Sequence, residues 1–184
     1  MRAGSPFEHT DHEVFVITAA HQGREGGQIA TWVLPGSLIP DQPRVVAVLS
    51  PLNATFDLIW QSRRFAVSLL AEEQIALLPH FGLRSGRELD KLAGVPLQRT
   101  AAGLPVPAGC CGFADCRLVD SLDGGDRVIC LADVVEQQVE PAARPLRLRE
   151  ALRRLPAHQR EALLEKRSRE GELARALRKS APGR

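Results

Sequence analysis

Hydroxyl and amide side chains gather where two predicted strands meet a predicted helix. Residues 28–34 and 44–50 favour strands, turn formers separate them, and Asn53 precedes a segment that favours a helix. This order can bring five polar residues near the start of that helix: Thr31, Ser37, Ser50, Asn53 and Thr55. Because free N–H groups at a helix N-terminus bind anions, we expect a phosphate cradle here. Ordinary turn and strand-surface hydroxyls explain the same residues equally well.

Other chemical signals in the chain are weak. The four cysteines lack the paired CxxC spacing of zinc and iron–sulfur sites, so we expect buried apolar residues and no metal. His9 and His12 lie in an N-terminal segment where a solvated tail is expected. There is no GxSxG elbow, and the glycines at 23–27 precede a strand, which predicts a hairpin loop over 22–27 rather than a phosphate motif.

The composition is that of a globular protein of ordinary size. The chain has 184 residues, of which 44% are hydrophobic and 25% charged, and this length favours one domain with an appendage. No run approaches the roughly 20 apolar residues of a membrane helix, and the N-terminus lacks an apolar stretch. We therefore expect a cytoplasmic protein that does not associate with membranes.

Charge divides the chain into an acidic body and a basic tail. Residues 1–140 hold 11 basic and 17 acidic side chains, a net −6, whereas residues 141–184 hold 13 and 5, a net +8. The tail interleaves both signs at i,i+4 spacing, as in Glu150 with Arg154 and Glu165 with Arg169, which is typical of a solvated helix. Nucleic-acid binding is therefore not expected.

The predicted elements indicate a mainly β protein with helices. We expect one domain at 1–140, a small β-barrel with helical insertions, followed by a basic helical extension at 141–184. A short helix at 72–81 should end at Pro79, the segment 87–93 could supply one or two helical turns, and Pro156 should separate two C-terminal helices. Strands are expected at 14–21, 28–34, 44–50 and 65–70 and in a hairpin at 113–139, and a helix follows Asn53.

The order of these segments resembles the flavin reductase-like family over roughly residues 10–139. The resemblance rests on VFVITA, GQIATWVLPGSLIP, VVAVLSPLNATFDLI, FAVSLL, HFG and FADCRLVDSLDGGDRVICLADV, in that order and spacing. It implies an FMN-binding split β-barrel that forms a homodimer.

The resemblance also implies which residues hold the flavin. Ile29, Ala30, Thr31 and Trp32 would run along the ring and ribityl chain, although Trp32 is equally well read as a core or dimer-interface aromatic. Ser37, Ser50, Asn53 and Thr55 would lie at the phosphate end, in agreement with the cradle above. Phe81, Gly82 and Arg84 follow the second helix, where relatives approach the flavin or the dimer partner.

Two residues depart from the family pattern. Leu52 stands where many relatives place a Lys or Arg, which leaves the phosphate charge to hydroxyls, the helix dipole, Arg84 or Lys91. Arg127 stands where many reductases place a His beside the nicotinamide, and it could pair with a pyridine-nucleotide phosphate. No catalytic side chain is assigned, because the flavin itself performs the redox step.

The resemblance therefore implies an oxidoreductase that binds FMN, with FAD as the alternative, and transfers hydride to flavin from NADH or NADPH. Free flavin, a partner oxygenase or another redox protein would accept the electrons. A different function remains open: a flavin-binding electron-relay module without NAD(P)H turnover, docking through its basic tail to an acidic redox partner.

Overall fold

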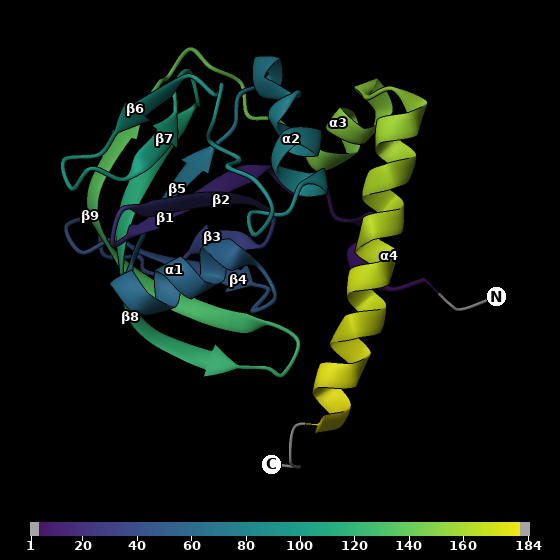
Figure 1. Cartoon of the computed structure of the whole chain (residues 1–184). Coiled ribbons are helices and arrows are strands. Elements are labelled where there is room, and N and C mark those ends of the chain that lie inside the picture. The colour runs from purple at the N-terminus through teal and green to yellow at the C-terminus, as the bar shows by residue number, and fades with distance from the viewer. Residues whose placement is uncertain (1–3, 181–184) are drawn as a thin grey trace.

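The computed structural model describes residues 4–180 and is built on one strongly curved, fully antiparallel sheet (Figure 1). Along this sheet the order is β2-β1-β5-β8-β9-β4-β3. Its strands are β1 (Phe15–His21), β2 (Arg24–Ala30), β3 (Val33–Pro35), β4 (Arg44–Leu49), β5 (Arg64–Leu69), β8 (Gly112–Asp123) and β9 (Val128–Val139). A separate pair consists of β6 (Leu97–Arg99) and β7 (Pro105–Pro107). The mainly β, split-barrel fold predicted from the sequence is confirmed.

Within residues 4–180, four α-helices and two short 3-10 turns complete the fold. The helices are α1 (Ala54–Ser62), α2 (Leu77–Leu83), α3 (Leu148–Arg154) and α4 (Ala157–Ser180), and the 3-10 turns are η1 (Pro6–His9) and η2 (Glu72–Gln74). As predicted, α1 follows Asn53 and Pro156 separates the last two helices. None of the helices within residues 4–180 is long and apolar enough to cross a membrane.

The hairpin predicted at residues 22–27 is present, but its loop is shorter than predicted. Only Gln22 and Gly23 turn, and Gly26 and Gly27 lie within β2, where they pair with Ala19 and Thr18 of β1. The glycines are needed because helices pack closely on both faces of β2: a Cβ on Gly27 would meet Phe81 of α2, and one on Gly26 would meet Leu58 of α1. The strand predicted through residue 34 is also interrupted, since β2 ends at Ala30 and β3 begins at Val33.

The helix around Pro79 also differs from the prediction. Pro79 does not end a helix but lies in the first turn of α2, where a missing N–H costs no hydrogen bond. The helical turns suggested for residues 87–93 are absent from the structure, which has turns and bends there.

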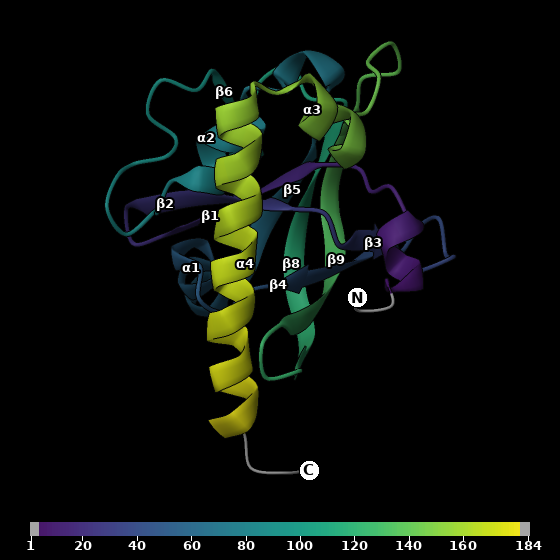
Figure 2. The same cartoon turned by 90° about the vertical axis from the view of Figure 1, so that its right-hand side faces the viewer.

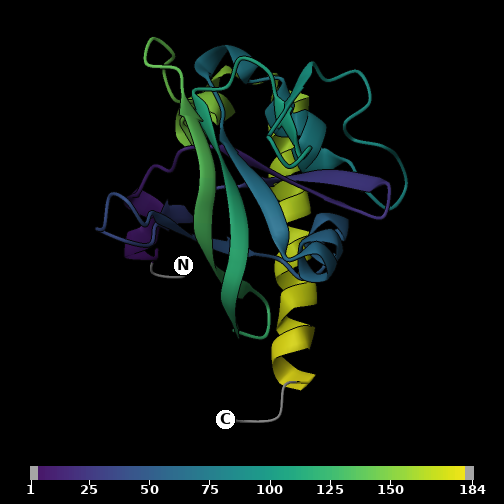
Figure 3. The same ribbon diagram turned by 90° about the vertical axis from the view of Figure 1, so that its left-hand side faces the viewer.

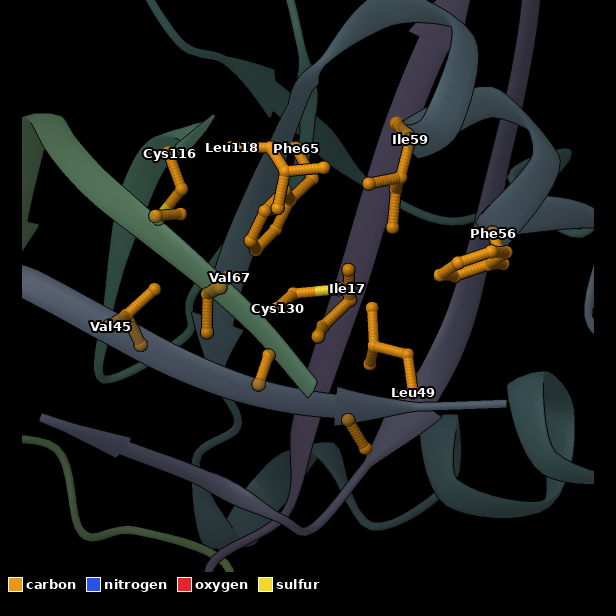
Figure 4. Packing of buried hydrophobic residues seen from close by; sticks show 14 of the residues in the cluster. Ile17, Val45, Leu49, Phe56, Ile59, Phe65, Val67, Cys116, Leu118 and Cys130 are labelled. Atoms are coloured by element: carbon orange, nitrogen blue, oxygen red, sulfur yellow. The ribbon is translucent and has the colours of Figure 1, made fainter. Parts of the chain in front are cut away.

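Among the described residues three hydrophobic clusters hold the elements together, and two of them pack helices against the sheet. The first fills the curve of the sheet beneath α1 and includes Ile17, Leu49, Ile59 and Phe65 (Figure 4). The second packs α2 and α3 against the start of β1 and the end of β5, and its members include Val14, Leu70, Phe81, Leu146 and Ala151. The chain after Pro145 therefore shares a core with the barrel. The domain boundary at 140 stays a prediction, and its outer limits at 1–3 and 181–184 lie outside the described residues.

Helix α4 runs along one side of the barrel beside α2. Its C-terminal half continues beyond α1, as the two turned views also show (Figures 2 and 3). Its described side chains are mostly exposed, and Ala174 is the one that is fully buried among them. The long helix is thus attached in both halves, since Leu163 packs with the second cluster and Ala174 is buried further along the helix.

Candidate functional site

Three of the predicted site residues lie on neighbouring segments at one end of the sheet. The carbonyl oxygen of Trp32 accepts a hydrogen bond of 2.9 Å from the Val48 N–H, which ties the β2–β3 link to β4. On the other side of β4, Leu49 pairs with Val128 of β9, so the same antiparallel register sets Ser50 opposite Arg127. Segments around residues 32, 50 and 127 therefore lie side by side.

The first turn of α1 follows β4 directly at this end of the sheet. Ser50 is buried, and its Oγ accepts a hydrogen bond from the Leu52 N–H at 3.3 Å. Asn53 occupies the N-cap position without a capping hydrogen bond from its side chain, and Thr55 is buried beside Gly26. The Asn53 amide and the free N–H groups of the helix start are therefore available to a ligand.

A loop rich in basic residues reaches the same helix start. Gly86 lies so close to α1 that a Cβ on it would be 3.6 Å from the Cβ of Ala54, and Arg87 forms a 2.9 Å ion pair with Asp57. Arg84 is exposed and forms no hydrogen bond or ion pair with any residue that the structure describes. The loop therefore brings a free guanidinium to the neighbourhood of α1, where Leu52 supplies no charge.

A pocket lies between this loop, the β1–β2 turn and the start of α1. Its volume is about 330 Å³. The lining residues are Gly23, Arg24, Glu25, Gly26, Ala54, Thr55, Leu58, Gly86 and Asp90. The absence of a side chain on Gly26 keeps this pocket open beside Thr55, because a Cβ there would lie 3.4 Å from Thr55 Oγ1.

The strand residues predicted to follow the flavin divide between two faces of β2. Ala30 is buried in the cluster under α1, whereas Ile29 packs with the second cluster, on the side of α2. Thr31 is partly exposed in the link that follows. Trp32 is 46% exposed, so it is not part of the core of this chain.

Ser37 does not join the other polar residues within this chain. It lies in the turn between β3 and β4, where its Oγ accepts a hydrogen bond from the Ile39 N–H at 3.0 Å. Gly36 is paired there with Arg44, at the far end of β4 from Ser50. Six strand residues span about 20 Å, which is too far for one phosphate group to contact both serines.

Lys91 is not the free cation that the sequence suggested. Its ammonium is buried and donates a 2.9 Å hydrogen bond to the carbonyl oxygen of Phe81. Burial, and then the nearby Lys166, lower the pKa of Lys91 from 10.5 to about 8, while Glu170 opposes the shift. Sequence reasoning missed Lys166, because no local pattern shows that α4 docks beside α2.

The four cysteines are buried, as expected. Burial raises the pKa of the Cys116 thiol to about 12 and that of Cys130 to about 11. Among the described residues, no group of three His, Cys, Asp or Glu side chains is arranged to hold a metal ion. The thiols are thus protonated packing residues near neutral pH.

Comparison with known proteins shows the family of this chain. A model of the flavin reductase like domain matches residues 7–155. The chain belongs to the flavin reductase-like family. The family match includes α3 and ends before α4 begins at Ala157.

This chain is similar to several known proteins, of which two relatives and one solved structure are described. The chain is 30% identical over 135 residues to a high molecular weight rubredoxin of Moorella thermoacetica, a match that covers 72% of this chain and 58% of the relative. It is 34% identical over 130 residues to the reductase component of a 4-nitrophenol 4-monooxygenase/4-nitrocatechol 2-monooxygenase of Rhodococcus opacus, covering 71% and 67%. The match thus leaves a large part of each relative uncovered.

The fold is similar to that of an FMN-binding protein from Thermus thermophilus, solved with bound p-hydroxybenzaldehyde. The TM-score is 0.67 at 26% identity, over 76% of this chain and 81% of that one.

Proposed function

We propose that this protein is a flavin reductase that binds FMN and transfers hydride to it from NADH or NADPH. The observation that carries the proposal is that Trp32, Ser50 and Arg127 lie on neighbouring segments near the open start of α1, in a chain of the flavin reductase-like family. Relatives named as FMN-binding protein and as monooxygenase reductase component support it.

The residues of this chain fit the chemistry of a flavin phosphate. Asn53 has an uncommitted amide, the first turn of α1 offers N–H donors, and Arg84 has a free guanidinium in the adjacent loop. Ser50 and Thr55 supply hydroxyls beside them. We propose that these groups hold the phosphate, and that Ile29, Ala30, Thr31 and Trp32 follow the ring and ribityl chain, with Phe81 behind β2.

When bound, the flavin supplies the redox chemistry itself, as the acceptor of a hydride. The side chains of this protein hold and orient the two nucleotides. Arg127 is partly exposed and donates one hydrogen bond, of 2.7 Å from Nη1, to the carbonyl oxygen of Asp126. Its remaining N–H groups can pair with a phosphate of the nicotinamide nucleotide, which we propose as its role.

We further propose that two copies of the chain associate. Four large apolar side chains are exposed around β3 and the turn after it: Trp32, Leu34, Leu38 and Ile39. An apolar group of this kind at the edge of a sheet suits a second copy of the same surface. The likeness to a reductase component further suggests a redox partner protein that accepts the electrons.

An absorbance titration of the full chain tests the proposed reaction. FMN is added to the purified protein, and NADH or NADPH is then added without oxygen. We expect a bound flavin band in the blue that bleaches with at least one of the two nucleotides. The Arg127→Gln variant tests the nucleotide contact separately: we expect FMN to bind as before and bleaching to need more nucleotide.

Two other outcomes would contradict the proposal. A protein that binds no FMN and no FAD is not a flavin reductase. A flavin band that persists with both nucleotides would instead favour the electron-relay module, which binds flavin but receives its electrons from another protein.

A further inference from the structure

Helix α4 lies outside the family match, yet it contacts the part of the molecule where the proposed flavin contacts lie. It begins at Ala157, two residues beyond the matched region, and runs beside α2 (Figure 2). Leu163 and Lys166, which are three residues apart on one face of α4, both reach Gly82 in the last turn of α2.

Leu163 occupies the space that a side chain at position 82 would need. A Cβ on Gly82 would lie 2.8 Å from Cδ2 of Leu163 and 3.9 Å from Cγ1 of Ile29. The last turn of α2, the strand β2 and helix α4 therefore meet at this glycine. A larger residue at position 82 would therefore require the end of the Leu163 side chain to move.

Lys166 binds the backbone at the same point. Its Nζ donates a 2.6 Å hydrogen bond to the carbonyl oxygen of Gly82, while Nζ of Lys91 donates to the preceding carbonyl, that of Phe81. Carbonyl groups in the last turn of a helix have no partner within the helix, and positive charge is favoured there. Two successive carbonyls of α2 are thus fixed by ammonium groups from two different segments.

Holding two ammonium groups this close has an electrostatic cost. Lys166 disfavours the charged form of the buried Lys91, and Glu170, one turn further along α4, compensates in part. A second hydrogen bond joins α2 to the Lys91 segment: Nε2 of His80 and the carbonyl oxygen of Lys91 lie 2.7 Å apart. The end of α2 is therefore held more firmly than a short surface helix would be by packing alone.

We propose that Lys166 is a positioning residue for the flavin site. From α4 it fixes the chain from Phe81 to Arg84, so that the Phe81 ring lies on β2 and the Arg84 loop lies beside the start of α1. This inference rests on the proposed function, because it takes Arg84 as a flavin contact and Phe81 as the residue that supports β2 from behind. In this chain a helix beyond the family domain thus takes part in building the cofactor site.

Binding of FMN to the full chain tests the role of Lys166. The dissociation constant is measured by quenching of flavin fluorescence for the wild type and for Lys166→Met, Lys166→Arg and Arg167→Met. We expect Lys166→Met to weaken binding about tenfold, because a charged hydrogen bond to Gly82 is lost. Lys166→Arg should restore most of the affinity, since a guanidinium can donate to the same carbonyl.

Arg167→Met is the matched control. Arg167 is the next residue of α4, is exposed, and forms no hydrogen bond or ion pair with the described residues, so its loss should leave binding unchanged. In steady-state assays Lys166→Met should raise the KM for FMN and leave kcat nearly unchanged. Thermal unfolding verifies that each variant is folded, and Lys166→Gln replaces Lys166→Met if the latter does not fold.

The outcomes separate this inference from the proposed function. Unchanged FMN affinity in folded Lys166→Met and Lys166→Gln, or an equal loss in Lys166→Arg, overturns the positioning role alone. Tighter binding also overturns it, and would show that α4 covers the site and competes with FMN. A wild-type protein that binds no flavin overturns the proposed function together with this inference.

Discussion

The ring of Phe81 lies in the space that a side chain on Gly27 would occupy. A Cβ built on Gly27 would be 2.6 Å from Cε1 and 3.0 Å from Cδ1 of that ring. Phe81 is itself almost fully buried, so it has little room to move. This contact sets the distance between α2 and β2, the two elements that bring Phe81 and Ile29 to the proposed site.

The Gly27→Ala variant should therefore be less stable than the wild type. Overpacking at a buried contact costs about 1–3 kcal/mol, and we expect a loss of that size in the free energy of unfolding, measured by urea denaturation. Gly171→Ala is the control, because Gly171 lies in α4 with no atom within 4 Å of an added Cβ. There the same change should stabilise the helix by about 0.5–1 kcal/mol. Equal effects of the two changes would contradict this account.

Asp115 should be a major contributor to stability. Its buried carboxylate accepts hydrogen bonds from Nε and Nη2 of Arg64 at 2.7 and 3.1 Å and from Oγ1 of Thr100 at 2.7 Å. Asp115→Ala should lower the free energy of unfolding by about 2 kcal/mol, because charged hydrogen bonds are lost and Thr100 is left without its acceptor. Asp120→Ala, at an exposed position on the same strand, should cost less than half as much. Similar melting temperatures for both variants would refute the prediction.

The lowered pKa of Lys91 predicts a stability that rises in alkaline solution. Because burial lowers this pKa from 10.5 to about 8, the unfolded chain binds more protons at Lys91 than the folded chain does between these two pH values. The contribution of Lys91 to the free energy of unfolding should increase from pH 8 to pH 10.5 and be lost as the pH falls back through 8. Urea denaturation of the wild type and of Lys91→Met measures it as the difference between the two proteins. A difference that stays constant would show that Lys91 titrates normally.

Loss of the polar cradle should weaken flavin binding. The double variant Thr31→Ala with Asn53→Ala removes a hydroxyl and the uncommitted N-cap amide, and about 1 kcal/mol per hydrogen bond predicts at least a tenfold rise in the dissociation constant for FMN. Gln137→Ala is the control, since Gln137 is an exposed amide at the far end of β9 from Arg127. If the folded double variant binds FMN like the wild type, the site has been placed wrongly.

Local signals in the sequence are sufficient to predict most of the strands and helices of the fold. The structure has strands at the β-branched runs 44–50 and 65–70 and a turn between β8 and β9, as predicted. Strand and turn preferences of this kind act within a few residues, so the local sequence shows them. Gly26 and Gly27 were misread as turn residues. The side chains of Leu58 and Phe81 occupy the space that a Cβ at these two positions would take. Both residues are distant in sequence, so the local sequence does not indicate the contact.

The candidate site was predictable only where its residues adjoin in the chain. Ser50, Asn53 and Thr55 belong to one turn and remain together, whereas Ser37 is separated from them by the length of β4. The approach of Gly86 to Ala54 and of Lys166 to Gly82 depends on how distant segments pack. No periodicity or spacing in the sequence indicates either contact.

The edge strand β3 limits how a second copy can attach. It has only three residues and ends at Pro35, which has no N–H to donate, and it pairs with β4 on one side only. A partner therefore cannot extend the sheet by adding a strand of regular length here. Any copy that covers Leu34 and Ile39 has to do so through side chains, which would give a dimer of two separate barrels and not one continuous sheet.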